Sequence, residues 1–200
     1  MPFRKEQTLV VIKPDGIQRS LVGEIIKRFE RLGLKLMAVK MFVPTPEFVE
    51  QHYTLDSEWR RKTGEKTIKN YKDKGLKSPS EDPYEITKIV LDNLKKYLGS
   101  GPVIAMVWQG MNAVKLVRKL VGDTEPLSSD VGTLRGDYVM DSYQICDIQG
   151  RAVRNLLHAS GNVEEAKKEI SHWFKPEEII NYRLIQEQIL YDVDLNGILE

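Results

Sequence analysis

The chain has 200 residues, of which 41% are hydrophobic and 30% charged, and its formal net charge is +1. This composition is typical of a soluble globular protein, and so small a charge argues against a surface built mainly for nucleic acid or acidic membranes. The single cysteine, Cys146, excludes an internal disulfide framework. Since the sequence also shows no apolar leader and no apolar run of ~20 residues, we expect a cytoplasmic protein that does not enter membranes.

The first part of the chain predicts two strands with a helix between them. β-Branched and apolar residues predict a strand over 8–12, and Lys13-Pro14-Asp15-Gly16 after it has the composition of a turn. Apolar residues recur at helical spacing over 22–32, and Gly33 ends this helix. Residues 34–43 predict the second strand.

The region 57–98 interrupts this compact pattern and predicts a helical insert. Thr45 caps a short helix before it, and Tyr53 lies just beyond the end of that helix. Residues 60–77 are rich in lysine and arginine, and Asp82 starts a helix with an apolar stripe formed by Ile86, Ile89, Val90, Leu94 and Tyr97. Such a basic segment can bind nucleic acid, but it more often faces water, so we favour the solvated interpretation.

After the insert, the pattern of strand, helix and strand returns. Residues 103–108 are uniformly apolar and predict a central strand, 112–121 predict a helix, and 153–157 predict a last buried strand. Two such units predict an α+β fold, a ferredoxin-like split βαβ antiparallel sheet with helices on one face. We expect a single domain over the whole chain, with the helical insert at about 57–98 and a C-terminal tail at 176–200.

The stretch around His158 is the strongest candidate for a catalytic site. The histidine follows the predicted strand 153–157, and Asn162 and Glu165 then form the N-cap and capping box of a helix. Glu169 lies two turns along that helix, where a carboxylate can bond one ring nitrogen and leave the other free to attack. The alternative for this stretch alone is a histidine kept at a strand end for packing.

Four further polar residues suggest what this histidine would act on. Lys13, Arg118, Thr124 and Arg135 lie close to glycines, and each by itself is more simply a surface, helix-end or loop side chain. With His158 they supply an ammonium, two guanidinium groups and a hydroxyl, which is what a polyphosphate needs around it. The sequence has no Walker motif, no kinase glycine loop and no histidine or cysteine cluster with metal-ligand spacing.

Five blocks of this sequence, in family order, resemble the nucleoside diphosphate kinase family. They are Lys13–Gly16, Arg19–Ile26, Ser100–Val103, Gly132–Asp137 and Asn155–Ser160. The last contains the specific pattern Asn-x-x-His-x-Ser, and the similarity covers most of the chain apart from the inserts and the tail. The resemblance implies a ferredoxin-like fold and the transfer of the γ-phosphate of a nucleoside triphosphate to a nucleoside diphosphate. It also implies a phosphohistidine intermediate and ping-pong kinetics, and a role in maintaining nucleoside triphosphate pools.

The resemblance also implies a role for individual residues. His158 matches the family's nucleophile, Ser160 and Glu169 match the residues that support its ring, and Tyr53 matches the tyrosine beside it. The nucleotide-binding positions are Lys13 and Asn155 for the sugar hydroxyls, and Arg118, Thr124 and Arg135 for the phosphates. Mg²⁺ is implied as a cofactor held mainly by the phosphates of the nucleotide, with no direct protein ligand.

Some positions depart from the family pattern. Gly161 stands where many members carry an acidic residue near the metal, and Ala159 replaces a common glycine.

Trp59, six residues after Tyr53, is our candidate for stacking on the base, and its alternative role is a core anchor for the inserted helices. A catalytically silent relative would lose the nucleophile or the phosphate-binding residues first, and none is lost here.

The loop around 141–151 is longer than in the family and lies in the region that the family uses for subunit contacts. The polar segment between Gly122 and Arg154 is long for free chain and suggests subunit contacts. We expect a homo-oligomer, a hexamer first and a tetramer or dimer second. The expected partners are ATP and other nucleoside tri- and diphosphates, with nucleic acid unlikely and no membrane.

Overall fold

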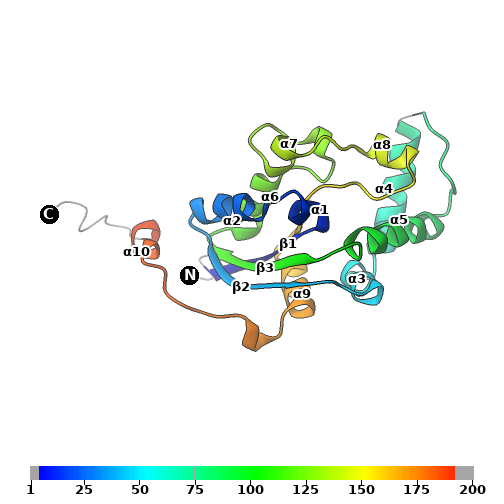
Figure 1. Ribbon diagram of the computed structural model, residues 1–200. Coiled ribbons are helices and arrows are strands. Elements are labelled where there is room, and N and C mark those ends of the chain that lie inside the picture. Colours follow the sequence, from blue (N-terminus) through cyan, green and yellow to red (C-terminus); the bar gives the residue numbers. More distant parts are fainter. Residues whose placement is uncertain (1–4, 74, 192–200) are drawn as a thin grey trace.

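The computed structural model describes residues 5–73 and 75–191, and a four-stranded sheet lies at its centre (Figure 1). The strands are β1 (Glu6–Ile12), β2 (Lys35–Phe42), β3 (Val103–Gly110) and β4 (Leu157–Ala159). They lie in the order β2-β3-β1-β4, with every neighbouring pair antiparallel. This order is that of a split βαβ sheet, so the predicted ferredoxin-like α+β fold is confirmed.

The two central strands, β1 and β3, are buried on both of their faces. Leu9 to Ile12 and Ala105 to Trp108 are fully buried. Because successive side chains of a strand point to opposite faces of the sheet, both faces must be covered by other elements. Helices α2 (Val22–Arg31) and α6 (Ala113–Val121) cover one face, and α9 (Val163–Trp173) covers the other (Figure 1). The expectation of helices on one face only is therefore wrong.

The segment after β1 is a short helix, α1 (Pro14–Gln18), where the sequence predicted a turn. Pro14 stands at its first position, where the missing N–H costs nothing. A Cβ on Gly16 would lie 2.8 Å from Ile12 Cγ2 and 3.2 Å from the Leu156 carbonyl oxygen. Gly16 therefore allows the chain before β4 to pass close to this helix.

The last strand begins later than the sequence predicted. Residues 153–156 are not in a strand, and Leu156 has a positive φ of 64°. Its backbone bonds the α1 segment instead, because the Lys13 N–H donates to its carbonyl at 2.8 Å and its own N–H donates to Asp15 Oδ2 at 3.2 Å. His158 consequently lies within β4, opposite Val11, and does not follow the strand.

The predicted insert consists of two helices, α4 (Trp59–Asp73) and α5 (Pro83–Leu98), which follow the short helix α3 (Pro46–Tyr53). Their backbones touch at Gly64, where a Cβ would lie 2.1 Å from the carbonyl oxygen of Pro83. The Thr87 hydroxyl donates to that same carbonyl at 2.6 Å and to the Arg60 carbonyl at 2.5 Å. A side chain larger than hydrogen at Gly64 would separate the two helices.

Acidic residues offset much of the positive charge of the basic segment 60–77. Five ion pairs join Arg60 to Glu50, Arg61 to both Glu58 and Glu65, Lys62 to Asp56, and Lys72 to Glu81, at N···O distances of 2.7 to 3.2 Å. Exposed pairs of this kind contribute little stability. They do reduce the net field that a nucleic acid would meet, which favours the solvated interpretation of the segment.

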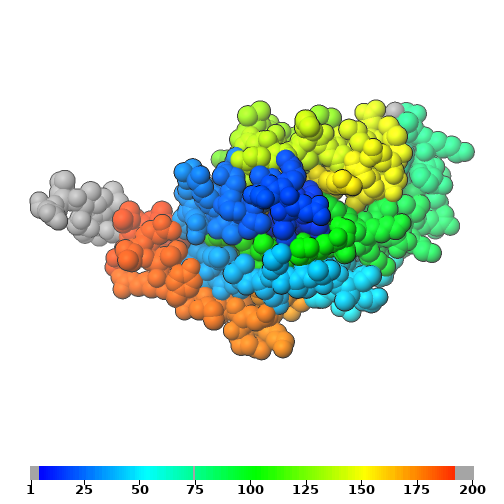
Figure 2. All heavy atoms as spheres, in the orientation of Figure 1, coloured from blue at the N-terminus to red at the C-terminus, as the bar shows by residue number. Residues whose placement is uncertain are grey.

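The segment from 123 to 150 contains the 3₁₀ helix η2 (Pro126–Ser128) and the short helices α7 (Leu134–Tyr138) and α8 (Tyr143–Ile148). The C-terminal segment contains η3 (Pro176–Glu178) and α10 (Gln186–Tyr191) and runs along the outside of the molecule to the end opposite the insert (Figure 2). It is tied to β2, because the Ile180 N–H donates to the Met37 carbonyl and Lys35 pairs with Glu187. The rest of the predicted tail, 192–200, lies outside the described residues.

Within the described residues, no helix has both the length and the apolar character needed to cross a membrane.

Candidate active site

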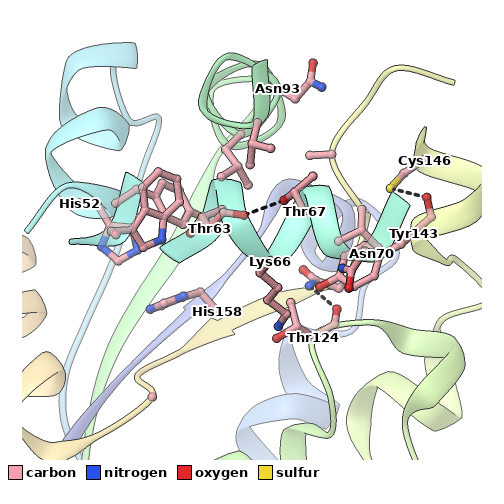
Figure 3. Close-up of a pocket in the computed structure, with 18 of the residues that line it drawn as sticks. His52, Thr63, Lys66, Thr67, Asn70, Asn93, Thr124, Tyr143, Cys146 and His158 are labelled. Atoms are coloured by element: carbon pink, nitrogen blue, oxygen red, sulfur yellow. Dashed lines mark hydrogen bonds between the residues drawn. The ribbon is translucent and has the colours of Figure 1, made fainter. Parts of the chain in front are cut away.

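A cavity of about 770 Å³ lies between the sheet, the inserted helices α4 and α5, and the α8 segment (Figure 3). Pockets of this size accommodate small-molecule ligands and cofactors. The predicted site residues that line it are Lys13, Tyr53, Trp59, Arg118, Thr124, Arg135, Asn155, His158 and Glu169. Ser160 is fully buried behind them. The fold therefore gathers at one place residues that lie far apart in the sequence.

His158 is held by the carboxylate of Glu169. His158 Nε2 lies 2.7 Å from Glu169 Oε1, and the His158 side chain is 16% exposed. The register explains the contact, since β4 places His158 opposite Val11 and α9 packs on that face of β1. Because a carboxylate accepts, Nε2 carries the proton and the lone pair remains on Nδ1. Within the described residues, no hydrogen bond is made by Nδ1.

The carboxylate of Glu169 is itself fixed on its other oxygen. The Ser160 hydroxyl donates to Glu169 Oε2 at 2.6 Å and accepts the Leu9 N–H at 3.2 Å. Burial would raise the pKa of Glu169, but the charge and hydrogen bond of His158 and the Ser160 hydroxyl lower it to about 2. Glu169 is therefore ionised at neutral pH and can accept both bonds.

His52 is part of this group, although the sequence analysis did not select it. The Trp173 indole N–H donates to His52 Nδ1 at 3.0 Å, so the proton of the neutral ring lies on Nε2, 3.8 Å from Glu169 Oε1. Its ring packs edge-on against the ring of His158 at 4.7 Å. Burial, followed by the charge of His158, lowers the pKa of His52 to about 3. The only available signal was its position next to Tyr53.

His52, His158 and Glu169 also have potential ligand atoms within 4.8 Å of one another, as a metal site would require. The bond from Trp173 argues against this use of the group. It occupies the lone pair of Nδ1 and keeps a proton on Nε2, so His52 has no lone pair to offer a cation.

Lys13 is buried and also lines the cavity. Its Nζ donates to Asn155 Oδ1 at 2.7 Å and lies 5.1 Å from the centre of the Tyr97 ring. Burial, followed by the charge of Arg135, lowers the pKa of Lys13 to about 7, although the nearby Asp15 opposes this shift. The Tyr97 hydroxyl donates to Asp15 Oδ1 at 2.5 Å. Tyr97 was predicted only as part of an apolar stripe, and that pattern does not predict a contact with Asp15.

Arg135 ties α7 to two other backbone segments, 122–123 and 155–157. Its guanidinium donates to four carbonyl oxygens at 2.6 to 3.1 Å, those of Gly122, Asp123, Asn155 and Leu157. These bonds leave one of its five N–H groups for a ligand. Burial, followed by the charge of Arg118, lowers the pKa of Arg135 to about 10. Most of the hydrogen-bonding capacity of Arg135 therefore positions the backbone of the site, and only a small part remains for a ligand.

Thr124, Arg118 and Trp59 complete the cavity wall. The Thr124 carbonyl accepts from Asn155 Nδ2 at 2.8 Å, which ties the loop after α6 to the segment before β4. Arg118 is half-buried near the end of α6. Trp59, also half-buried, packs on Tyr53 with ring centres 5.3 Å apart. Trp59 lines the cavity, as a residue that stacks on a base must, but its role stays a prediction.

Comparisons with known proteins show which family the chain resembles over most of its length. The family profile described as nucleoside diphosphate kinase matches residues 6–75 and 83–179. A nucleoside diphosphate kinase of Pyrobaculum aerophilum is 46% identical over 179 residues, which span 88% of this chain and 98% of the relative. The crystal structure of an NDP kinase from the same organism superposes with a TM-score of 0.85 at 44% identity, covering 88% of this chain and 100% of that one.

A second solved structure carries ligands. It is a transition-state mimic of nucleoside-diphosphate kinase from Borrelia burgdorferi with bound vanadate and ADP, 33% identical, with a TM-score of 0.75. The match covers 92% of this chain and 95% of that one. With the family profile and the Pyrobaculum relatives, these similarities show that the chain belongs to the nucleoside diphosphate kinase family.

Proposed function

We propose that this enzyme, which transfers phosphate from nucleoside triphosphates to nucleoside diphosphates, carries the phosphoryl group on Nδ1 of His158. The observation that supports this most directly is the 2.7 Å contact between His158 Nε2 and Glu169. It directs the proton to Nε2 and leaves the nucleophilic lone pair on Nδ1. The group would keep this arrangement throughout the reaction, because Ser160 fixes the second carboxylate oxygen.

The reaction proceeds in two matched steps. In the first, the Nδ1 lone pair attacks the γ-phosphorus, the bond from that phosphorus to the bridging oxygen breaks, and the nucleoside diphosphate leaves. The ring then bears positive charge, which the ionised Glu169 stabilises through the Nε2 proton. In the second step, a terminal phosphate oxygen of another nucleoside diphosphate attacks the phosphorus, and the N–P bond breaks. Catalysis rests on positioning and charge stabilisation.

The nucleotide would be held by the polar residues of the cavity wall. Lys13 and Asn155 would bond the sugar hydroxyls, and Arg118, Thr124 and the remaining N–H of Arg135 would bond the phosphates. Trp59 would offer its face to the base, and Tyr53 would pack beside the histidine. The cationic character of this wall supports a polyanionic ligand, since guanidinium groups bond phosphate oxygens in pairs.

We also propose Mg²⁺ as the cofactor, held mainly by the nucleotide's own phosphates. The bond from Trp173 to His52 supports this assignment, because it removes the one cluster of the described residues with the spacing of a metal site. When bound, the ion would neutralise the negative charge that develops on the phosphate oxygens during transfer.

Labelling tests the phosphohistidine. ATP carrying a labelled γ-phosphate should leave acid-labile label on the wild-type protein, and His158→Ala should abolish it. A second nucleoside diphosphate added afterwards should remove the label and become a triphosphate. Acid-stable label, or label that persists in His158→Ala, would overturn the proposal.

For assembly we propose a homo-oligomer, a hexamer first and a tetramer or dimer second, in the cytoplasm. Two separate apolar surfaces support more than one kind of subunit contact. The edge strand β2 and its end expose Val39, Met41 and Val43, and the segment around α7 exposes Leu127, Val131 and Met140. Large exposed apolar side chains that are grouped in this way mark interaction surfaces.

A further inference from the structure

The lysines of α4 differ in whether they have an acidic partner. Lys62 pairs with Asp56 at 3.2 Å and Lys72 pairs with Glu81 at 3.1 Å. Lys66 and Lys69 lie between them and have no ion-pair partner in the described part of the chain. Lys66 lines the active-site cavity, whereas Lys69 does not. The insert therefore directs one unpaired ammonium group into the site.

Lys66 belongs to a polar face of α4 that lines the cavity. Thr63, Lys66, Thr67 and Asn70 recur at intervals of three and four residues, which places them on one side of the helix. Figure 3 shows these residues along the cavity side of α4, with the Lys66 side chain extending in the direction of Thr124. Thr124 is on the wall that we assign to the phosphates.

The charges in the cavity favour an anion beside Lys66. Most acidic residues of the lining already have partners: Asp56 bonds Lys62, Glu164 bonds Lys167, and Glu169 bonds His158. Arg118, Arg135 and Lys13 add positive charge around the same space. Because these carboxylates are occupied by other partners, the remaining cations attract an anion into the cavity, and a flexible ammonium suits a phosphate as a point charge.

We propose that Lys66 binds the phosphate chain of the nucleotide from the side of the insert, facing Thr124. The insert would then contribute a phosphate contact of its own and close the site over the bound nucleotide. This inference rests on the proposed function, because it takes the cavity as the nucleotide site. Lys66 would contact phosphates that are not transferred, so it would strengthen binding of the nucleotide more than it lowers the chemical barrier.

The test compares Lys66→Gln with Lys69→Gln, which removes the same charge from the same helix outside the cavity. Calorimetric titration with ADP should show binding weakened about tenfold in Lys66→Gln and changed less than about twofold in Lys69→Gln. Lys66→Arg should retain most of the affinity. In steady state, KM for ADP, GDP and CDP should rise by similar factors in Lys66→Gln, with kcat nearly unchanged, because a phosphate contact is independent of the base.

Two outcomes would overturn the inference. Unchanged ADP affinity in Lys66→Gln would show a solvated lysine, and a loss that differs strongly among the three bases would show a contact to the base. The titration does not depend on catalysis, so its result is separate from the labelling of His158. If His158 is labelled and Lys66→Gln binds ADP normally, the inference fails while the proposed function stands.

Discussion

At the scale of single residues, the proposed mechanism makes the ionised carboxylate of Glu169 the group that orients the nucleophile His158. Glu169→Gln would keep a hydrogen-bonding side chain and remove the negative charge that stabilises the phosphorylated ring. A charge-assisted bond contributes about 1.5–3 kcal/mol, so we expect His158 phosphorylation to slow by roughly 10- to 150-fold. Single-turnover labelling with ATP measures this rate. His158→Ala should show no labelling at all, and an equally complete loss in folded Glu169→Gln would contradict the orienting role.

The buried, neutral His52 predicts a pH dependence of stability. Its pKa is about 3 in the folded protein against 6.5 for the free side chain, so the unfolded chain binds one more proton between these values. The stabilisation is therefore complete above about pH 6.5 and is lost as pH falls toward 3, by at most about 1.4 kcal/mol per unit.

Replacement of His52 by glutamine removes this titration and keeps an oxygen to accept the Trp173 N–H. Between about pH 6.5 and pH 5, urea unfolding should show the wild type losing roughly 2 kcal/mol more than His52→Gln. The pKa of Glu169 is about 2 in the folded protein against 4.5 for the free side chain, so its contribution to stability changes below about pH 4.5, outside this window. Parallel losses in the two proteins would show that His52 is not held neutral.

The sequence revealed those candidate site residues that belong to short sequence motifs. His158, Lys13 and Asn155 stand in short blocks whose pattern resembles a known family, and the structure brings them to one cavity. His52 and Tyr97 could not be found in this way, because their roles depend on partners more than 80 residues away in sequence. A tyrosine in an apolar stripe looks the same whether or not its hydroxyl meets a carboxylate.

At the scale of elements, the contact between α4 and α5 determines where the polar face of α4 lies. Gly64→Ala would bring a methyl group against the Pro83 carbonyl and push the helices apart. We expect a stability loss of about 1–3 kcal/mol and a rise in KM for nucleotides, since overpacking displaces backbone. Gly23→Ala is the matched control, because a Cβ there has nothing within 4 Å. Denaturant unfolding and steady-state kinetics measure both effects, and equal behaviour of the two variants would contradict the role of this contact.

Hydrophobic periodicity predicted most elements but not where every one begins or how they are layered. Helices α2, α5, α6 and α9 were predicted because their apolar spacing and caps are local signals. The start of β4 was misplaced because Leu156 is apolar and buried, yet its backbone bonds Lys13 and Asp15. Hydrogen bonds between distant segments do not change the spacing of apolar residues, so periodicity cannot predict them. The division of the chain into one domain with an insert stays a prediction.

At the scale of the whole molecule, the distribution of exposed apolar side chains predicts how subunits meet. Met41 on the edge strand is 58% exposed, and Met140 beyond α7 is 97% exposed. An edge strand with free backbone groups and apolar side chains is a ready surface for pairing with a second copy. A hexamer needs two kinds of contact, and these surfaces lie on different elements.

Light scattering at micromolar concentration should therefore give a mass of about six chains of 23.0 kDa for the wild type. Met41→Glu places a charge on the β2 surface, and Met140→Glu places one on the α7 surface. Because burying an unpaired charge is costly, each should reduce the assembly, to different smaller species if the two surfaces make different contacts. Tyr84→Glu, at an exposed residue of the insert, is the control and should leave the mass unchanged. A wild-type monomer would refute the assembly, and unchanged mass in both methionine variants would show that the subunits meet elsewhere.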